Sequence, residues 1–330
     1  MLPYEKRAKE RTMLIKKEAE SSLTYGSSPY NRSVKELLSA GVINVNKPKG
    51  PTSHEVSEFV KDILHVKKAG QSGTLDPAVT GVLPVGIEKG TKALQAVLKA
   101  GKEYVCLMHL HDDYTPEQIR STCANFVGLI KQLPPIKSAV KRQYRFRRIY
   151  YLDILEIKGR EVLFTVGCQA GTYIRKLCVD IGEALGSSAH MAQLVRTRVG
   201  NFVLENSYTL QDISDAFRLY KESTDETTLR KVLLPIEEIV SHLPKVYVFD
   251  SVVRYICNGS NLAIPGLSKL DSDIEPDELV AVMSLKGELI ALGFALCNST
   301  VMFTEKEGLC VKVEFVLMDP LTYPKLSSKE

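Results

Sequence analysis

The stretch AGQSGTLDPAVTGVLP, at residues 69–84, carries one ionisable side chain, the carboxylate of Asp76. Three glycines let its backbone pass close to a bulky ligand, and the neighbouring serine and threonines offer hydrogen-bond donors without a competing charge. A single carboxylate on such a loop suits a nucleophile or a general base that acts on one atom of a sugar or a base. Because an aspartate before a proline is also a common turn former, the loop alone leaves a purely structural role open.

The composition places this loop in an ordinary globular protein, with 330 residues, 44% hydrophobic and 25% charged. The longest apolar runs, such as ELIALGFAL, are too short to cross a bilayer, and the opening twenty residues are too polar for a signal segment. Seven scattered cysteines without a CxxC pair argue against a disulfide framework and favour a reducing cytoplasm. The net charge of +4 is too small to identify a partner.

The apolar pattern predicts an α+β fold, because strand pairs alternate with helices without a regular parallel repeat. A helix is predicted from about Ser53, with Ser53 as its N-cap, and a hairpin is predicted to turn at Lys158-Gly159. Further helices are predicted in TPEQIRSTCANFVGLI, TYIRKLCVDIGEALG and AHMAQLVRTRVG, and a strand in KEYVCLMHLH.

A break near PIEEIVSHLPKVYVFD separates this region from short strands with glycine turns. We therefore expect a large α+β domain at 41–242 and a small, mostly β module at 243–325. An N-terminal extension at 1–40 is expected to pack on the rest, and 326–330 form a tail.

Most of the chain resembles the TruB and dyskerin families of RNA pseudouridine synthases, and it is most similar to the guide-RNA enzymes of archaea. The motifs that carry the resemblance are, in chain order, NVNKPKGPTSHEV, SGTLDPAVTGVLPV, GKEYVC, LPPIKSAVKR, AGTYIRKLCVDIG and GSSAHMAQLVRTRVG. The segment from LPKVYVFD to YPKL is similar to the PUA module of archaeal and eukaryotic members. The resemblance implies a catalytic domain with a mixed, mainly antiparallel sheet, followed by a small β-rich PUA domain.

The resemblance assigns the chemistry of the site. Pseudouridine forms when the C1′–N1 bond of uridine breaks, the base turns and C1′ joins C5, so no redox cofactor or metal is needed. By similarity Asp76 is the catalytic carboxylate, Arg175 its cationic partner and Tyr104 the ring that stacks on the extruded base. Without the resemblance, Arg175 reads as a surface helix arginine and Tyr104 as core packing. Whether Asp76 attacks the ribose or removes a sugar proton stays open.

Five further residues are expected by similarity to line or support the site or to contact RNA. Leu194 matches a pocket wall, Tyr173 is expected to support packing, and Lys47 is expected, with Arg196, to support the site or contact RNA. Gln71 replaces a histidine that bacterial and many archaeal relatives carry two residues before the central glycine of the motif. Since glutamine still donates and accepts hydrogen bonds, we expect activity with altered contacts beside the target base.

Basic and aromatic residues interleave in KSAVKRQYRFRRIYY, which predicts contacts with splayed RNA, although a solvated strand edge has the same composition. The residues proposed to bind RNA there are Lys141, Arg142, Arg145, Arg147 and Arg148. In the PUA-like segment, Gly259 and Gly266 are expected by similarity to let a guide RNA approach closely, or else to form ordinary turns. His109 and His111 share a strand face beside two aspartates, but a third ligand is missing, so no metal site is predicted.

The resemblance implies an isomerase that converts specific uridines of rRNA to pseudouridine within a guide-RNA-directed box H/ACA ribonucleoprotein, with tRNA uridine 55 as another candidate. The implied partners are RNA and small core proteins, including a zinc-binding peptide-like subunit and a kink-turn binder. Two alternatives stay open: a stand-alone tRNA enzyme and a catalytically silent RNA-binding assembly protein. The chain ends at KLSSKE without the long basic tail of eukaryotic relatives, which favours an archaeal cytoplasm.

Overall fold

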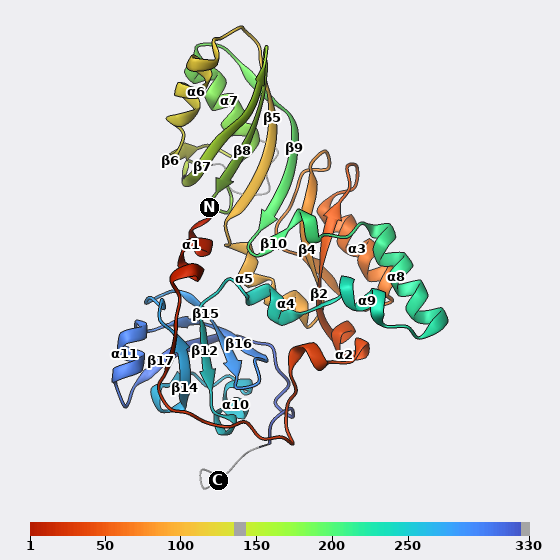
Figure 1. Cartoon of the computed structure of the whole chain (residues 1–330), viewed down its shortest axis with the longest axis vertical. Helices are drawn as coiled ribbons and strands as arrows, with labels where there is room; N and C mark the ends of the chain where they lie inside the picture. The colour runs from red at the N-terminus through yellow and green to blue at the C-terminus, as the bar shows by residue number, and fades with distance from the viewer. Residues whose placement is uncertain (135–142, 325–330) are drawn as a thin grey trace.

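The computed structural model describes residues 1–134 and 143–324, so Lys141 and Arg142 of the predicted RNA-binding run lie outside the described residues. Two β-sheets follow one another along the molecule, and the smaller sheet lies at the end near the C-terminus (Figure 1). None of the helices in the described part of the chain is long and apolar enough to cross a membrane.

The larger sheet has the order β11-β2-β4-β9-β5-β8-β7-β6 within the described residues, with β3 and β10 paired to its side. Its neighbours are antiparallel except β4 and β9, which pair in parallel. This confirms the predicted α+β class. The strands are β2 (Ala40–Lys47), β3 (Ala69–Gln71), β4 (Thr80–Glu88), β5 (Lys102–Leu110), β6 (Gly128–Gln132), β7 (Arg145–Lys158), β8 (Glu161–Cys168), β9 (Ala189–Val199), β10 (Phe202–Val203) and β11 (Leu234–Pro235).

Two groups of helices cover the two halves of this sheet (Figure 1). Around β2 and β4, apolar side chains of α2 (Val34–Ser39), α3 (Ser53–Leu64), α8 (Leu210–Ser223) and α9 (Thr227–Val232) form one core. Around β5, β8 and β9, the second core contains α6 (Pro116–Ala124) and α7 (Ile174–Leu185). The β4–β9 pair joins the two halves, and the loop that contains Asp76 enters β4 beside this junction.

The segment AHMAQLVRTRVG was predicted to be a helix, and this prediction is wrong, because it forms the central strand β9. Ala, Met, Gln and Leu favour helix in isolation. Here the segment pairs with β5 along its length and also with β4 at Val195 and Arg196. Tertiary pairing therefore overrides local propensity.

Two element boundaries also differ from the predictions. The helix predicted through TPEQIRSTCANFVGLI ends at Ala124, and Gly128, at φ 118°, begins strand β6 instead. The N-cap of α3 is Thr52, whose side chain accepts a hydrogen bond from the backbone N–H of Glu55. Ser53 is buried, and its hydroxyl bonds to the backbone of Leu75 in the Asp76 loop.

The smaller sheet has the order β1-β14-β12-β15-β16-β17-β13, so a strand from the N-terminus completes the C-terminal module. In that pairing, Met13 lies opposite Asp271. Its elements are β1 (Met13–Ile15), β12 (Lys245–Val248), α10 (Asp250–Cys257), β13 (Leu262–Ala263), β14 (Leu267–Asp271), β15 (Leu279–Ser284), β16 (Leu289–Ala295), α11 (Ser299–Thr304) and β17 (Leu309–Val316). The helix α1 (Pro3–Glu10) lies between the two sheets (Figure 1).

Candidate active site

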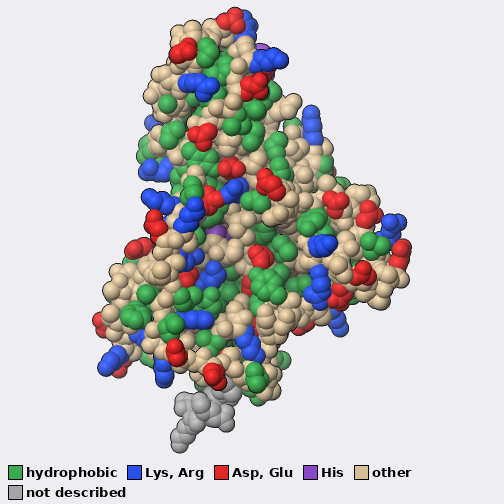
Figure 2. Space-filling view, in the orientation of Figure 1, with side chains coloured by type: hydrophobic (Ala, Val, Ile, Leu, Met, Phe, Trp, Pro, Cys, Tyr) green, Lys and Arg blue, Asp and Glu red, His purple; other side chains and the backbone are tan. Residues whose placement is uncertain are grey.

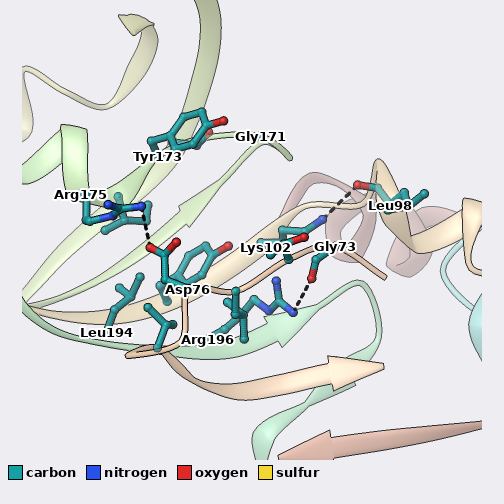
Figure 3. Close-up of a pocket in the computed structure, with 15 residues that line it drawn as sticks. Gly73, Asp76, Leu98, Lys102, Gly171, Tyr173, Arg175, Leu194 and Arg196 are labelled. Carbon is teal, nitrogen blue, oxygen red and sulfur yellow. Dashed lines mark hydrogen bonds and ion pairs between the residues drawn. The ribbon is translucent and has the colours of Figure 1, made fainter. Parts of the chain in front are cut away.

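A cavity of about 450 Å³ opens between the Asp76 loop, strands β5 and β9 and the start of α7 (Figure 3). Six of its lining residues were predicted from the sequence to matter: Asp76, Tyr104, Tyr173, Arg175, Leu194 and Arg196. The structure thus brings to one place side chains from four segments that are distant in the chain.

The loop holds Asp76 in a fixed backbone arrangement. Gly81, at φ 105°, lies so close to β9 that a Cβ there would be 2.2 Å from the carbonyl oxygen of Arg196. From below, the buried Lys47 ammonium donates hydrogen bonds to the carbonyl oxygens of Pro77 at 3.2 Å and Val79 at 2.9 Å. Lys47 therefore supports the loop from beneath and does not line the cavity.

The Asp76 carboxylate pairs with the Arg175 guanidinium, with Oδ2 and Nη2 2.8 Å apart. Arg175 lies in the first turn of α7 and reaches across the cavity to the loop (Figure 3). The two side chains are 45% and 48% exposed, so the pair faces the open cavity. A carboxylate in this position is held in orientation by a charge-assisted contact while one side stays accessible to a substrate.

Two walls of the cavity come from adjacent strands. Tyr104 on β5 is 7% exposed, and its burial, opposed by the nearby positive charge of Arg196, raises the pKa of its phenol to about 12. Leu194 on β9 is 9% exposed. These side chains offer a neutral aromatic ring and an apolar surface on which a flat base can pack.

Tyr173 lies at the cavity rim, where the side chain of Gln132 fixes its backbone. The Tyr173 N–H donates to Oε1 of Gln132 at 3.0 Å, and Nε2 of Gln132 donates to the Tyr173 carbonyl at 3.1 Å. Gln132 was not singled out from the sequence. Exposed and buried residues alternate along strand β6, but the predicted helix covered its first residues, so the strand was not predicted.

Three cationic side chains are buried at the site: Lys102 and Arg196 line the cavity, and Lys47 lies against the Asp76 loop. Arg196 donates from Nε to the carbonyl of Val82 at 2.7 Å and from Nη2 to that of Gly73 at 3.4 Å. Among residues 1–134 and 143–324, no carboxylate forms a salt bridge with any of the three. Sequence reasoning missed Lys102, although its position two residues before Tyr104 on a strand places both side chains on one face.

Gln71 lies on β3 opposite Val85, and it is not among the residues that line the cavity. Its Oε1 atom is buried and has no hydrogen-bond partner among the described residues. An effect of Gln71 on RNA contacts therefore remains a prediction.

The arginines of β7 divide between its two faces. Arg148 and Phe146 are exposed, whereas Arg145 and Arg147 are partly buried on the other face. Arg147 packs at the cavity rim, where a Cβ at Gly171 would meet its Nε at 3.1 Å. The face of the molecule in Figure 2 shows basic and acidic side chains interspersed over its whole length. RNA contact at β7 remains a prediction, and Arg147 is the arginine of this strand that lies next to the cavity.

The two glycines predicted to approach guide RNA differ in surroundings. Gly259 follows α10 at φ 91° with open space where a Cβ would project. At Gly266 a Cβ would meet Val252 and Leu262 at 3.1–3.2 Å, inside the module, so packing alone accounts for that glycine.

A third histidine joins the pair seen in the sequence. His111 Nε2 lies 2.9 Å from His190 Nδ1, and His109 Nδ1 lies 2.7 Å from a Glu161 oxygen. The pairing of β5 with β9, hidden by the helix prediction, brings His190 here. Even so, the described residues contain no group of three or more His, Cys, Asp or Glu side chains that could hold a metal ion.

Comparison with known protein families defines the class of this site. Residues 61–174 match the N-terminal domain of the TruB family of pseudouridylate synthases, and residues 175–241 match the C-terminal domain of tRNA pseudouridylate synthase B. Residues 244–317 match the PUA domain, and residues 6–57 match the DKCLD domain. The protein is therefore an RNA pseudouridine synthase, a uridine isomerase.

Whole-chain relatives specify the family. The chain is 52% identical over 98% of its length to a probable tRNA pseudouridine synthase B of Methanopyrus kandleri, of which the match covers 95%. It is 50% identical over 96% of its length to a protein of the same description from Pyrococcus horikoshii, of which the match covers 96%. The chain belongs to the TruB family of pseudouridine synthases.

Solved structures agree with this assignment. A chain from a Cbf5-Nop10-Gar1 complex superimposes with a TM-score of 0.94 at 49% identity, covering 99% of both chains. A chain from an H/ACA ribonucleoprotein bound to a substrate RNA that contains 2′-deoxyuridine superimposes with a TM-score of 0.90 at 47% identity, covering 96% of this chain and 98% of the other.

Proposed function

We propose that this protein isomerises specific uridines in RNA to pseudouridine as the catalytic subunit of a guide-RNA-directed box H/ACA ribonucleoprotein. The observation that carries the catalytic assignment is the 2.8 Å contact between Asp76 and Arg175 inside the cavity. The near-complete superposition on Cbf5-type chains supports the ribonucleoprotein setting.

In this proposal the target uridine leaves its stack and enters the cavity, where Tyr104 and Leu194 hold the base between them. Asp76, held in orientation by the contact with Arg175, acts at the ribose as nucleophile or as base. The C1′–N1 bond breaks, the base turns within the cavity, and a C1′–C5 bond forms. A proton leaves C5 and one is gained at N1, so atoms balance without an electron carrier.

The partners we propose are guide RNA, an rRNA or tRNA substrate, and small core proteins, one a zinc-binding peptide-like subunit and another a kink-turn binder. Supporting this, similar chains were solved with Nop10, Gar1 and substrate RNA. We assign catalysis to residues 41–242, RNA end recognition to residues 243–325 and a packing role to residues 1–40.

We also place the enzyme in the cytoplasm, since seven free cysteines suit a reducing compartment.

A second candidate function is stand-alone modification of tRNA uridine 55. It is favoured by the description of the relatives at 52% and 50% identity as probable tRNA pseudouridine synthases B. The third reading, a silent assembly protein, conflicts with a paired Asp76 that faces an open cavity.

The experiment compares wild type with Asp76→Asn on two labelled substrates, a tRNA and a target RNA with its guide and core proteins. We expect pseudouridine on the guided target, and a loss of about 10³-fold or more in the variant, because the amide cannot act as an anion. RNA binding should persist, since the amide is nearly isosteric. The control is Asp215→Asn on α8, where the Asp215 side chain is 47% exposed. Near-normal turnover by Asp76→Asn would remove the catalytic assignment, and product on tRNA alone would support the second candidate.

A further inference from the structure

Lys102 is a buried, charged cavity residue to which the proposed reaction gives no task. It begins β5, is 6% exposed and lines the cavity. Its burial, and secondarily the nearby charge of Arg196, lowers the pKa of its ammonium group to about 8. A buried cation without a carboxylate is costly, so a structural reason for a lysine at this place is needed.

The contacts of the Lys102 ammonium all point to one turn. Nζ donates to the carbonyl oxygens of Ala100 at 2.9 Å, Leu98 at 3.2 Å and Val97 at 3.4 Å. These carbonyls lie at and just after the end of α5 (Gln95–Leu98), where helix carbonyls lack partners within the helix. The three donors of an ammonium group thus gather three oxygens around one point, which a planar guanidinium cannot do.

The turn at the end of α5 contributes an apolar side chain to the cavity lining. Leu98 lines the cavity with its side chain 37% exposed. It lies at the end of the cavity away from Arg175, and Lys102 lies between them (Figure 3). A half-exposed leucine on a short turn keeps its position only if the turn is held, and the Lys102 hydrogen bonds hold it.

We propose that Lys102 is a positioning residue, which fixes the turn after α5 so that Leu98 forms the wall on which the RNA nucleotide in this end of the cavity packs. The inference rests on the proposed function, because it assumes that a splayed-out nucleotide enters the cavity. Lys102 acts through Leu98 and does not touch the reacting atoms. Its effect belongs to substrate binding and leaves the rate of the bound complex unchanged.

The test is a double-mutant cycle with Lys102→Met, Leu98→Ala and the combined variant, assayed in single turnover over a range of RNA concentrations. Each single variant should raise the RNA concentration for half-maximal rate about 5- to 20-fold, with less than about twofold change in the saturating rate. The combined variant should match the single variants, since both remove the same wall. Lys99→Met is the matched control, because Lys99 is exposed and its ammonium lies over the ring of Phe294.

A pH series supplies a second readout. In wild type the half-maximal concentration should rise above about pH 8, as Lys102 loses its proton and one donor. Lys102→Met should lack this rise, and so should Leu98→Ala, which keeps the test valid even if the lysine variant folds poorly. Additive effects in the cycle, or equal behaviour of Lys102→Met and Lys99→Met, would overturn the inference. An active Asp76→Asn would instead overturn the proposed function, so the two failures are distinguishable.

Discussion

At the scale of single residues, the site contains an exposed ion pair and a set of buried cations. The Asp76–Arg175 pair is about half exposed and faces the open cavity, whereas Lys47, Lys102 and Arg196 are buried. The first pair was predictable only through family resemblance, since nothing in the spacing of the two residues joins a loop to the first turn of α7. The buried cations bind backbone carbonyls, and a sequence does not show where carbonyls converge.

The lowered pKa of Lys102 also leads to a prediction of how the free energy of unfolding depends on pH. Its pKa is about 8 in the fold against 10.5 for an ordinary lysine, so the unfolded chain binds more protons between these pH values. The contribution of Lys102 to the free energy of unfolding therefore rises as the pH increases from about 8 to 10.5. Over the whole window the increase is about 3 kcal/mol. The unfolding free energy of wild type relative to Lys102→Met, measured by urea titration, should increase across this window. A difference that stays flat would mean that the ammonium is solvated.

At the scale of elements, the exposed arginine of strand β7 leads to a prediction of how RNA affinity depends on salt concentration. If Arg148 neutralises one phosphate, Arg148→Ala should lower the slope of log K against log salt by about 0.7–0.9. The control is Arg160→Ala near the tip of the same hairpin, where Arg160 pairs with Asp113 at 2.8 Å. Binding measured from low to moderate salt distinguishes the two. An unchanged slope for Arg148→Ala would take this face of β7 out of the RNA interface.

Elements whose apolar residues recur with a regular period were predictable from the sequence, whereas strand β9, which carries Leu194 and Arg196, was not. The hairpin at Lys158-Gly159 and the strand that carries Tyr104 follow from alternation and a glycine turn. The segment that contains Leu194 and Arg196 is rich in helix formers, and only its two neighbouring strands make it extended. Its place in the sheet comes from contacts that are distant in sequence, which local patterns do not encode.

At the scale of the whole molecule, the two sheets do not form separable units. One apolar core joins Val82, Ala93 and Val97 of the catalytic part to Met283 and Leu292 of the C-terminal module. Strand β1 belongs to the smaller sheet although it lies near the N-terminus. Removing residues 243–330 would expose this core and leave β1 without its partner, so such a truncation reports on folding before it reports on guided modification.

Substitutions in α1 and just after it test how the N-terminal segment is joined to the C-terminal module. Arg11 is 11% exposed, and its Nε lies 2.8 Å from Asp273 and 3.7 Å from Asp271. Its Nη1 also donates to the carbonyl of Leu243 at 2.9 Å, at the start of the C-terminal module. Burial already raises the pKa of Asp271, while the backbone N–H of Lys245 and the charge of Arg11 oppose that rise.

Arg11→Ala should therefore lower the free energy of unfolding by about 3 kcal/mol, because it removes the guanidinium beside the buried Asp271 and the partly buried Asp273. Arg7→Ala is the matched control: Arg7 pairs with Glu278 at 2.6 Å and with Asp273 at 3.3 Å, but it is 39% exposed, so its loss should cost about 1 kcal/mol or less. Urea unfolding of both variants gives the comparison. Since the Arg11 contacts join the N-terminal segment to the C-terminal module, limited proteolysis of Arg11→Ala should also cut first in residues 1–20. Equal destabilisation by the two substitutions, or a protease-resistant N-terminus, would show that the Arg11 contacts are not needed to hold the N-terminal segment on the C-terminal module.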